Sequence, residues 1–179
     1  KEQGELKDNM VVSTVMSNIG FYKAIEENEL QSVKTAVGDR YVVEEMRKND
    51  YSLGGEQSGH IVLMNYATTG DGILTAVKLA NIIKTSGKSL EELASEVNIY
   101  PQKLVNIKVV DKKTAMEDAE ILAECEKVEK ELEGNGRILL RASGTENLIR
   151  VMVEASSDEL TDKYCEQVAK IVREKFEVK

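Results

Sequence analysis

The sequence contains few of the residues that bind transition metals or form disulfides. Among its 179 residues are two cysteines, Cys125 and Cys165, and one histidine, His60. The cysteines lie far apart, each within a pattern typical of an amphipathic helix, and no Cys-x-x-Cys pair occurs. We therefore expect two free thiols and no zinc or redox motif. One histidine, with no three carboxylates at short spacing, also argues against a metal site in this chain.

Long hydrophobic runs and an excess of basic charge are also absent. The apolar runs are only a few residues long, far short of the ~20 that span a membrane, and nothing resembles a signal peptide. Lysine and arginine total 24 against 32 aspartates and glutamates, a net charge of −8. Nucleic-acid-binding proteins present a basic face. We therefore expect no nucleic-acid partner, no membrane partner and a cytoplasmic location with reduced thiols.

The only proline, Pro101, marks the boundary between two differently patterned halves. Residues that precede proline tend to leave the helical region. We therefore predict a linker over 98–103 that joins a domain over 1–97 to a domain over 104–179.

The first half alternates strand and helix patterns. Runs rich in apolar and β-branched residues predict strands near 10–15, 32–36, 51–53 and 61–64. Capping residues predict helix starts at Asn18, Asp39, Asp71 and Ser89. After Asp71, the spacing predicts a helix with an apolar face made by Ile73, Val77, Ala80 and Ile83. This order predicts an α/β domain with a mixed, largely parallel sheet.

The second half predicts an α+β domain. An alternating strand over 104–110 precedes a helix whose apolar positions are Ile121, Cys125, Val128 and Leu132. Two adjacent strands then flank a turn at 143–145, and a last helix begins near Asp158. The order β-α-β-β-α predicts a small antiparallel sheet with both helices on one face.

The turn between the last two strands has the composition of an anion site. Arg141 and Arg150 offer planar, permanently charged forks that match a phosphate. Ser143 and Thr145 add hydroxyls, and successive backbone amides can converge on an anion. Gly144 lets a ligand approach the backbone and can adopt a positive φ. An ordinary hairpin turn would explain the same residue types.

A second dense segment, Gly-Gly-Glu-Gln-Ser-Gly-His at 54–60, has the composition of a polyol site. In an extended chain Glu56, Ser58 and His60 project from one face, and they offer a carboxylate, a hydroxyl and an imidazole to sugar hydroxyls. Taken alone, His60 is better explained as a structural residue at the start of a strand. Arg40, at the start of a predicted helix, is a candidate substrate contact through a ligand phosphate.

These segments resemble the phosphohexomutases (the α-D-phosphohexomutase superfamily). The 54–60 segment is similar to their sugar-binding loop, and Arg-Ala-Ser-Gly-Thr-Glu at 141–146 is similar to their phosphate-binding loop. The segments at 14–18, 37–42 and 69–72 specifically resemble the bacterial phosphoglucosamine mutases. The motifs occur in family order over essentially the whole chain.

The resemblance implies a four-domain enzyme of which this chain is the third and fourth domains. The family's phosphorylated serine and its magnesium-binding Asp-x-Asp-x-Asp loop lie in the first two domains, and neither motif occurs here. We therefore expect no catalytic residue and no metal ligand in this chain, and no activity from it alone. A start at Lys1 rather than Met also suggests a fragment or a processed product.

The implied reaction interconverts glucosamine 6-phosphate and glucosamine 1-phosphate, on the route to UDP-N-acetylglucosamine and peptidoglycan. It proceeds through a phosphoserine and a bisphosphate intermediate. The full-length enzyme would need Mg²⁺, and glucosamine or glucose bisphosphate would serve as intermediate or activator. The expected partner is a small-molecule hexosamine phosphate. The full-length protein is also a candidate homodimer. The alternatives are a phosphomannomutase or phosphoglucomutase of the same superfamily, or a non-catalytic sugar-phosphate-binding module.

By resemblance, Glu56 and Ser58 bind sugar hydroxyls, and His60 supports that loop or the leaving oxygen. The phosphate that does not react would be held by Arg141, Ser143, Gly144, Thr145 and Arg150. One departure stands out, because the family loop usually has proline where this chain has Ala142 and Asn147. Proline stiffens a turn by fixing φ, so the two substitutions predict a looser loop.

Overall fold

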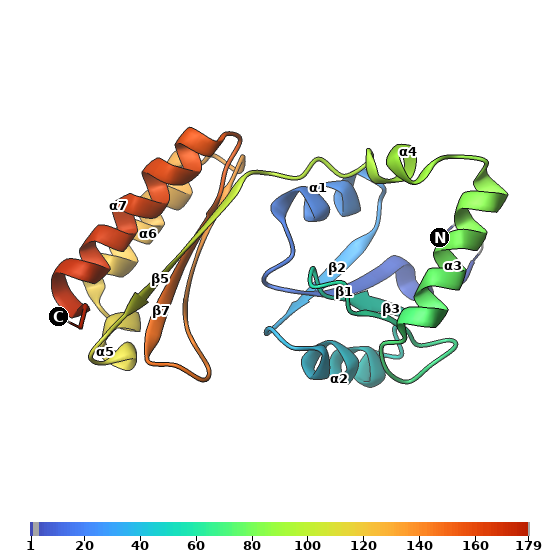
Figure 1. Ribbon diagram of the computed structural model, residues 1–179, viewed down its shortest axis with the longest axis horizontal. Helices are drawn as coiled ribbons and strands as arrows, with labels where there is room; N and C mark the ends of the chain where they lie inside the picture. Colours follow the sequence, from blue (N-terminus) through green and yellow to red (C-terminus); the bar gives the residue numbers. More distant parts are fainter. Residues whose placement is uncertain (2–3, 179) are drawn as a thin grey trace. The chain divides into compact units, whose positions relative to one another are not determined.

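The computed structural model describes residue 1 and residues 4–178. The chain divides into two compact units, 1–99 and 100–179, shown in Figure 1 from blue through green to red.

The first unit is built on a four-stranded sheet in the order β2-β1-β3-β4. After a short 3-10 turn (Lys7–Asn9), its strands are β1 (Met10–Thr14), β2 (Gln31–Thr35), β3 (Leu53–Gly55) and β4 (Ile61–Leu63). Strand β1 pairs in parallel with β2 and β3, whereas β3 and β4 form an antiparallel hairpin. The expected mixed, largely parallel sheet is therefore confirmed.

Two helices lie on opposite sides of this sheet, α1 (Ile19–Glu27) and α2 (Asp39–Asn49) (Figure 1). The core joins β1, α2 and β4 through Val12, Val42, Val43, Met46 and Val62. Gly54 permits this close packing, since a Cβ there would lie 2.5 Å from the sulfur of Met46. The packing of α2 against β3 thus brings the start of α2 near the β3–β4 turn.

The third helix, α3 (Gly72–Ser86), follows the expected apolar spacing, but its apolar face is exposed. Asp71 caps it by accepting hydrogen bonds from the amides of Ile73 and Leu74, as the sequence predicts. None of its residues is buried, and Ile73 and Val77 are 81% and 62% exposed. The helix contacts the edge strand β4, and the described residues leave its apolar face uncovered. The spacing of apolar residues shows that a helix has an apolar face, but it does not show which residues cover that face. The short helix α4 (Leu90–Ala94) follows, with Ser89 and Glu92 forming a capping box.

The second unit is a three-stranded antiparallel sheet in the order β5-β7-β6, with helices on one face (Figure 1). The strands are β5 (Gln102–Lys108), β6 (Arg137–Ala142) and β7 (Leu148–Glu154), and the long helices are α6 (Ala119–Glu131) and α7 (Asp158–Phe176). This confirms the predicted antiparallel sheet and its two covering helices.

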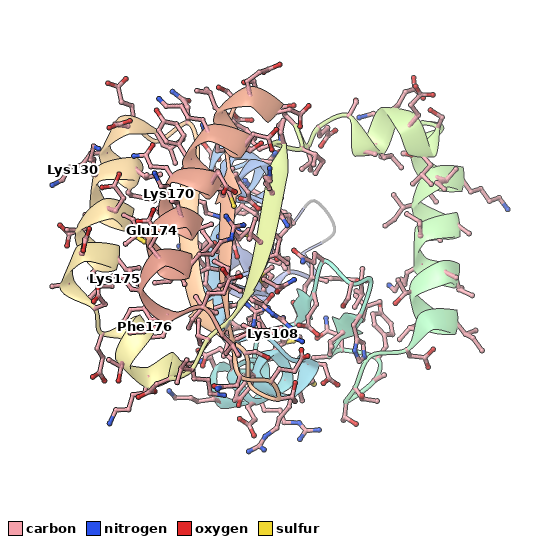
Figure 2. The ribbon with its side chains drawn as sticks, turned by 60° about the vertical axis from the view of Figure 1, so that its left-hand side comes forward. Lys108, Lys130, Lys170, Glu174, Lys175 and Phe176 are labelled. Atoms are coloured by element: carbon pink, nitrogen blue, oxygen red, sulfur yellow. The ribbon has the colours of Figure 1, made fainter. Side chains whose placement is uncertain are left out.

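A one-turn helix, α5 (Lys112–Met116), was not predicted. Asp111 caps it by accepting from the amides of Lys113 and Thr114. At the same end of the unit, the chain after α7 returns to β5, because Val110 donates to the carbonyl of Phe176 and Val178 donates to that of Lys108. Figure 2 shows Lys108 and Phe176 at this junction and the charged side chains along α6 and α7.

The core of the second unit occupies the helix-covered face of the sheet. Ile149, Val151 and Val153 of β7 belong to it, together with buried residues of α6 and α7. Alternation along β7 places Arg150, Met152 and Glu154 on the opposite face.

None of the helices in the described part of the chain is long and apolar enough to cross a membrane.

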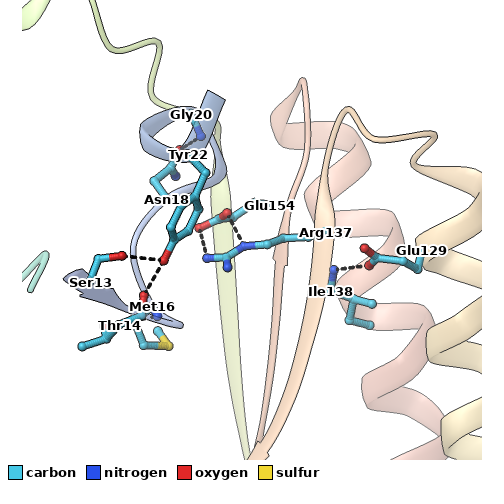
Figure 3. A network of polar contacts seen from close by, with 10 residues as sticks. All are labelled: Ser13, Thr14, Met16, Asn18, Gly20, Tyr22, Glu129, Arg137, Ile138 and Glu154. Atoms are coloured by element: carbon cyan, nitrogen blue, oxygen red, sulfur yellow. Dashed lines mark hydrogen bonds and ion pairs between the residues drawn. The ribbon is translucent and has the colours of Figure 1, made fainter. Parts of the chain in front are cut away.

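Each unit also contains a polar network of its own (Figure 3). In the first, the Tyr22 hydroxyl donates to the Thr14 carbonyl at 2.7 Å and lies 3.0 Å from the Ser13 hydroxyl. In the second, the Arg137 guanidinium holds the fully buried carboxylate of Glu154 with two bonds, at 2.7 and 3.2 Å.

Candidate functional site

Arg141 and Arg150 occupy directly opposite positions in the β6–β7 pairing. Both lie on the sheet face away from the helices. Their Nε atoms are buried and have no hydrogen-bond partner among the described residues. Burial lowers the pKa of Arg141, and the positive charge of Arg150 lowers it further. Two like charges therefore share one partly desolvated position at the end of a hairpin.

This arrangement is costly unless an anion joins it. Like charges directly opposite on neighbouring strands destabilise a sheet, and a buried donor without a partner loses its hydration without compensation. The carboxylate of Glu146, 4.0 Å from an Nη of Arg150, offsets only part of the charge. An oxyanion between the two guanidinium groups would satisfy the buried Nε donors and remove the repulsion.

The 143–147 loop connects the two strands beside this arginine pair. Ser143 is buried and shapes the loop: its amide donates to the Leu148 carbonyl at 2.9 Å, and its hydroxyl accepts from the Glu146 amide at 3.3 Å. Gly144 and Thr145 are exposed. Gly144 does not adopt a positive φ. Its contribution is space, because a Cβ there would meet nothing within 4 Å.

Two further side chains fix this loop: Lys112 lies outside its motif, and Asn147 belongs to the loop but stands out in the sequence only as a departure from the family's proline. Lys112, at the start of α5, donates to the carbonyls of Ser143 and Glu146 at 2.9 and 3.4 Å. Asn147 donates from its side chain to the carbonyls of Val109 and Val110 at 2.8 and 3.1 Å. Nothing in the sequence indicates that Lys112 contacts the loop, because Lys112 lies 31 positions from Ser143.

The first unit holds the second candidate cluster, in the turn between β3 and β4. Here the Glu56 amide donates to the His60 carbonyl at 2.9 Å, and the Gly59 amide donates to the Glu56 carbonyl at 3.0 Å. The segment is a tight turn rather than an extended chain, so the side-chain alternation assumed for Glu56, Ser58 and His60 does not apply. Instead, Glu56 and His60 face each other across the turn, and Ser58 lies exposed within it.

The start of α2 lies beside this turn. The Gly38 amide donates to Oε1 of Glu56 at 2.9 Å, and Nδ1 of His60 lies 3.8 Å from Oδ2 of Asp39. The His60 ring also packs against Gly70, where a Cβ would lie 1.9 Å from Nε2. The structure thus joins three segments that the sequence presented separately. Asp39, interpreted from sequence only as a turn and helix-start residue, lies beside the imidazole.

Arg40 has a different environment. Its side chain is 77% exposed, and its Nε donates to Oε1 of Glu44 at 2.8 Å, one turn along α2. That ion pair raises the pKa of Arg40. A surface pair of this kind is weak, so Arg40 can exchange Glu44 for a ligand.

The two clusters suit different chemistry. The hairpin of the second unit offers positive charge and buried donors, which suits an oxyanion. The 56–60 turn offers a carboxylate, a hydroxyl and an imidazole, which suit hydroxyl groups. Within the described residues no group of three or more His, Cys, Asp or Glu side chains could hold a metal ion.

Comparison with protein families gives one match to each unit. Residues 1–100 match the family of phosphoglucomutase/phosphomannomutase, alpha/beta/alpha domain III, and residues 104–171 match the C-terminal domain of phosphoglucomutase/phosphomannomutase. Both candidate clusters lie within these matched segments.

Among curated proteins, the chain is similar to phosphoglucosamine mutases of bacteria. It is 61% identical to that of Leuconostoc mesenteroides over 97% of this chain and 38% of the relative. It is also 61% identical to that of Anoxybacillus flavithermus, over 98% of this chain and 39% of the relative. The chain thus spans about two fifths of the length of these relatives.

Solved structures show the same fold at low sequence identity. The N-acetylphosphoglucosamine mutase of Aspergillus fumigatus matches with a TM-score of 0.81 at 22% identity, over 92% of this chain and 38% of that one. The same fungal enzyme solved with GlcNAc-6P and magnesium matches with a TM-score of 0.78, also at 22% identity, over 92% of this chain and 38% of that one. Together with the two domain matches, these comparisons show that the chain belongs to the phosphoglucomutase/phosphomannomutase family.

Proposed function

We propose that this chain is the substrate-binding half of a phosphoglucosamine mutase, which interconverts glucosamine 6-phosphate and glucosamine 1-phosphate. The observation that carries the proposal is the Arg141–Arg150 pair. Its buried Nε atoms have no hydrogen-bond partner among the described residues, and an oxyanion would accept hydrogen bonds from both. The 61% identity to bacterial phosphoglucosamine mutases supports glucosamine phosphate as the substrate.

In this proposal the second unit holds the phosphate that does not react. Arg141 and Arg150 neutralise its charge, and the exposed residues Gly144 and Thr145 donate to its oxygens. Ser143 also shapes the loop, because its hydroxyl accepts from the Glu146 amide, while its O–H remains available to donate to a phosphate oxygen. Binding energy gained at a non-reacting phosphate orients the sugar, which is where remote contacts accelerate a reaction.

The first unit binds the sugar hydroxyls. Glu56 presents a carboxylate whose Oε1 is already fixed by the Gly38 amide, so its position is set before a ligand arrives. Ser58 adds an exposed hydroxyl. His60, held between Asp39 and Gly70, supports the turn and can donate or accept at a sugar oxygen. Arg40 is the additional contact proposed for a ligand phosphate.

Phosphoryl transfer itself lies outside this chain in the proposal. The fungal enzyme has been solved with magnesium and, in another structure, with glucose 1,6-bisphosphate. We propose that the full-length cytoplasmic enzyme likewise uses Mg²⁺ and a bisphosphate intermediate, with the metal held by residues beyond this chain. The residues described here contribute binding and orientation.

Amide NMR titration of the chain tests this assignment for each unit. Inorganic phosphate should shift the amides of 143–146, and glucosamine should shift those of 56–60. Glucosamine 6-phosphate should shift both sets. No response of 143–146 to phosphate would contradict the anion site, and no response of 56–60 to either sugar ligand would contradict the sugar site.

Substrate choice within the family is tested by the same titration with other hexose phosphates. We expect glucosamine 6-phosphate to shift the 56–60 amides at lower concentration than glucose 6-phosphate or mannose 6-phosphate. A preference for either of the latter would favour a phosphoglucomutase or a phosphomannomutase instead.

A further inference from the structure

The 143–147 loop has few hydrogen bonds of its own. Within the hairpin, the Ser143 amide donates to the Leu148 carbonyl and the Glu146 amide donates to the Ser143 hydroxyl. Residues 144–147 are exposed bends. A loop of this kind orders only if other groups fix it, because each residue held in one conformation costs entropy.

Asn147 fixes one end of the loop to the segment after β5. Its side-chain amide donates to the carbonyls of Val109 and Val110, and its own carbonyl accepts from the Val109 amide at 3.1 Å. Three hydrogen bonds therefore tie one loop residue to two consecutive residues of a neighbouring segment. Asn147 stands where the similar family loop has proline, so hydrogen bonds here replace the stiffness of a ring.

Lys112 fixes the body of the loop from the same neighbouring segment. Its ammonium reaches the carbonyls at both ends of the exposed turn, those of Ser143 and Glu146. Carbonyl oxygens carry partial negative charge and repel a bound anion. A cation bonded to two of them offsets that repulsion, and its charge adds to that of the arginine pair.

We propose that Lys112 and Asn147 are positioning residues that hold the 143–147 loop in its anion-binding conformation. The proposal rests on the anion-binding function proposed above and deepens it. Neither residue needs to touch the phosphate, because both act through the loop backbone. Pre-ordering the loop removes an entropy cost that binding would otherwise bear.

The test measures inorganic phosphate affinity, by calorimetry, in the 179-residue chain and four variants. Lys112→Met and Asn147→Ala should each weaken phosphate binding about tenfold, because binding would then have to order a loop that these hydrogen bonds hold in place beforehand. Lys112→Arg keeps a charged donor and should stay within about threefold of the unsubstituted chain. Lys113→Met removes the same charge from an exposed position on the same helix and should change affinity less than about twofold.

A second readout separates positioning from direct charge. Without phosphate, hydrogen exchange of the 144–146 amides should be faster in Lys112→Met and Asn147→Ala than in Lys113→Met. Unchanged phosphate affinity and exchange in both variants would overturn the positioning role while leaving the anion site standing. An equal loss in Lys113→Met would overturn it too, because net charge would then explain the effect. Failure of the unsubstituted chain to bind phosphate would overturn the proposed function itself.

Discussion

At the residue scale, the most informative feature is the pair of opposed arginines, Arg141 and Arg150, whose buried Nε atoms have no hydrogen-bond partner among the described residues. The motif at 141–146 predicts arginine, serine and threonine near a phosphate. It does not show that Arg141 and Arg150 are cross-strand neighbours with buried Nε atoms. That information depends on strand register, which sets the partner of every residue in the hairpin.

The 56–60 turn shows a different limit of residue-level prediction. Glu56, Ser58 and His60 were expected to share a face because the segment was assumed to be extended. Three glycines in seven positions instead permit a tight turn. The same residues come together, but through hydrogen bonds across the turn and through α2. The partners Gly38 and Asp39 could not be inferred from the 54–60 motif.

Glu56 gives the prediction at this scale. Glu56→Ala removes the acceptor of the Gly38 amide and the carboxylate proposed for sugar hydroxyls. The response of the 56–60 amides to glucosamine 6-phosphate should require about tenfold more ligand. The phosphate response of 143–146 should be unchanged. Glu26→Ala, at an exposed position of α1, is the matched control. A normal sugar response in Glu56→Ala would contradict the role of this carboxylate.

At the element scale, hydrophobic periodicity predicted most helices and strands correctly. The strands near 10–15, 32–36 and 61–64 and the helices capped by Asn18, Asp71 and Ser89 appear close to where the patterns placed them. The helix α5 was missed because one turn carries too short a pattern to detect. The exposed face of α3 was not foreseen because periodicity describes a helix and not its neighbours.

The sheet of the second unit gives the element-scale prediction. Arg137→Met would remove the two hydrogen bonds that the guanidinium donates to the fully buried carboxylate of Glu154. The free energy of unfolding should fall by about 3–5 kcal/mol, measured by urea denaturation. Replacing both residues, as in Arg137→Met with Glu154→Leu, should restore much of that loss, because no buried charge remains.

The control for this prediction is an exposed ion pair of the same unit. Lys103→Met removes the partner of Asp162, and both side chains of this pair are solvent-accessible. It should leave the unfolding midpoint nearly unchanged. An Arg137→Met variant as stable as Lys103→Met would contradict the importance of the buried pair.

At the scale of the whole molecule, the chain consists of two units with separate cores. We propose that the segment near Pro101 joins them as the linker predicted over 98–103, the last two residues of which begin β5. Residues 100–179 contain all members of their own core cluster. Expressed alone, they should unfold in one cooperative transition. They should also keep the phosphate affinity of the full chain within about twofold, because the arginine pair and its loop lie inside this unit.

That prediction is checked by thermal unfolding and by phosphate titration of the isolated unit. A broad transition, or poorly dispersed amide signals, would show that the second unit depends on residues 1–99 for its structure. Normal folding with lost phosphate binding would show that the anion site needs groups from outside the unit.

The most direct test of the central claim is calorimetric titration of the 179-residue chain with inorganic phosphate, with and without Arg141→Gln. The matched control is Arg173→Gln, which removes the same charge from a pair on α7. We predict saturable binding that weakens at least about tenfold in Arg141→Gln, with little change in Arg173→Gln. Equal affinity in all three proteins, or no saturable binding in the unsubstituted chain, would contradict the assignment of the Arg141–Arg150 pair as an anion site.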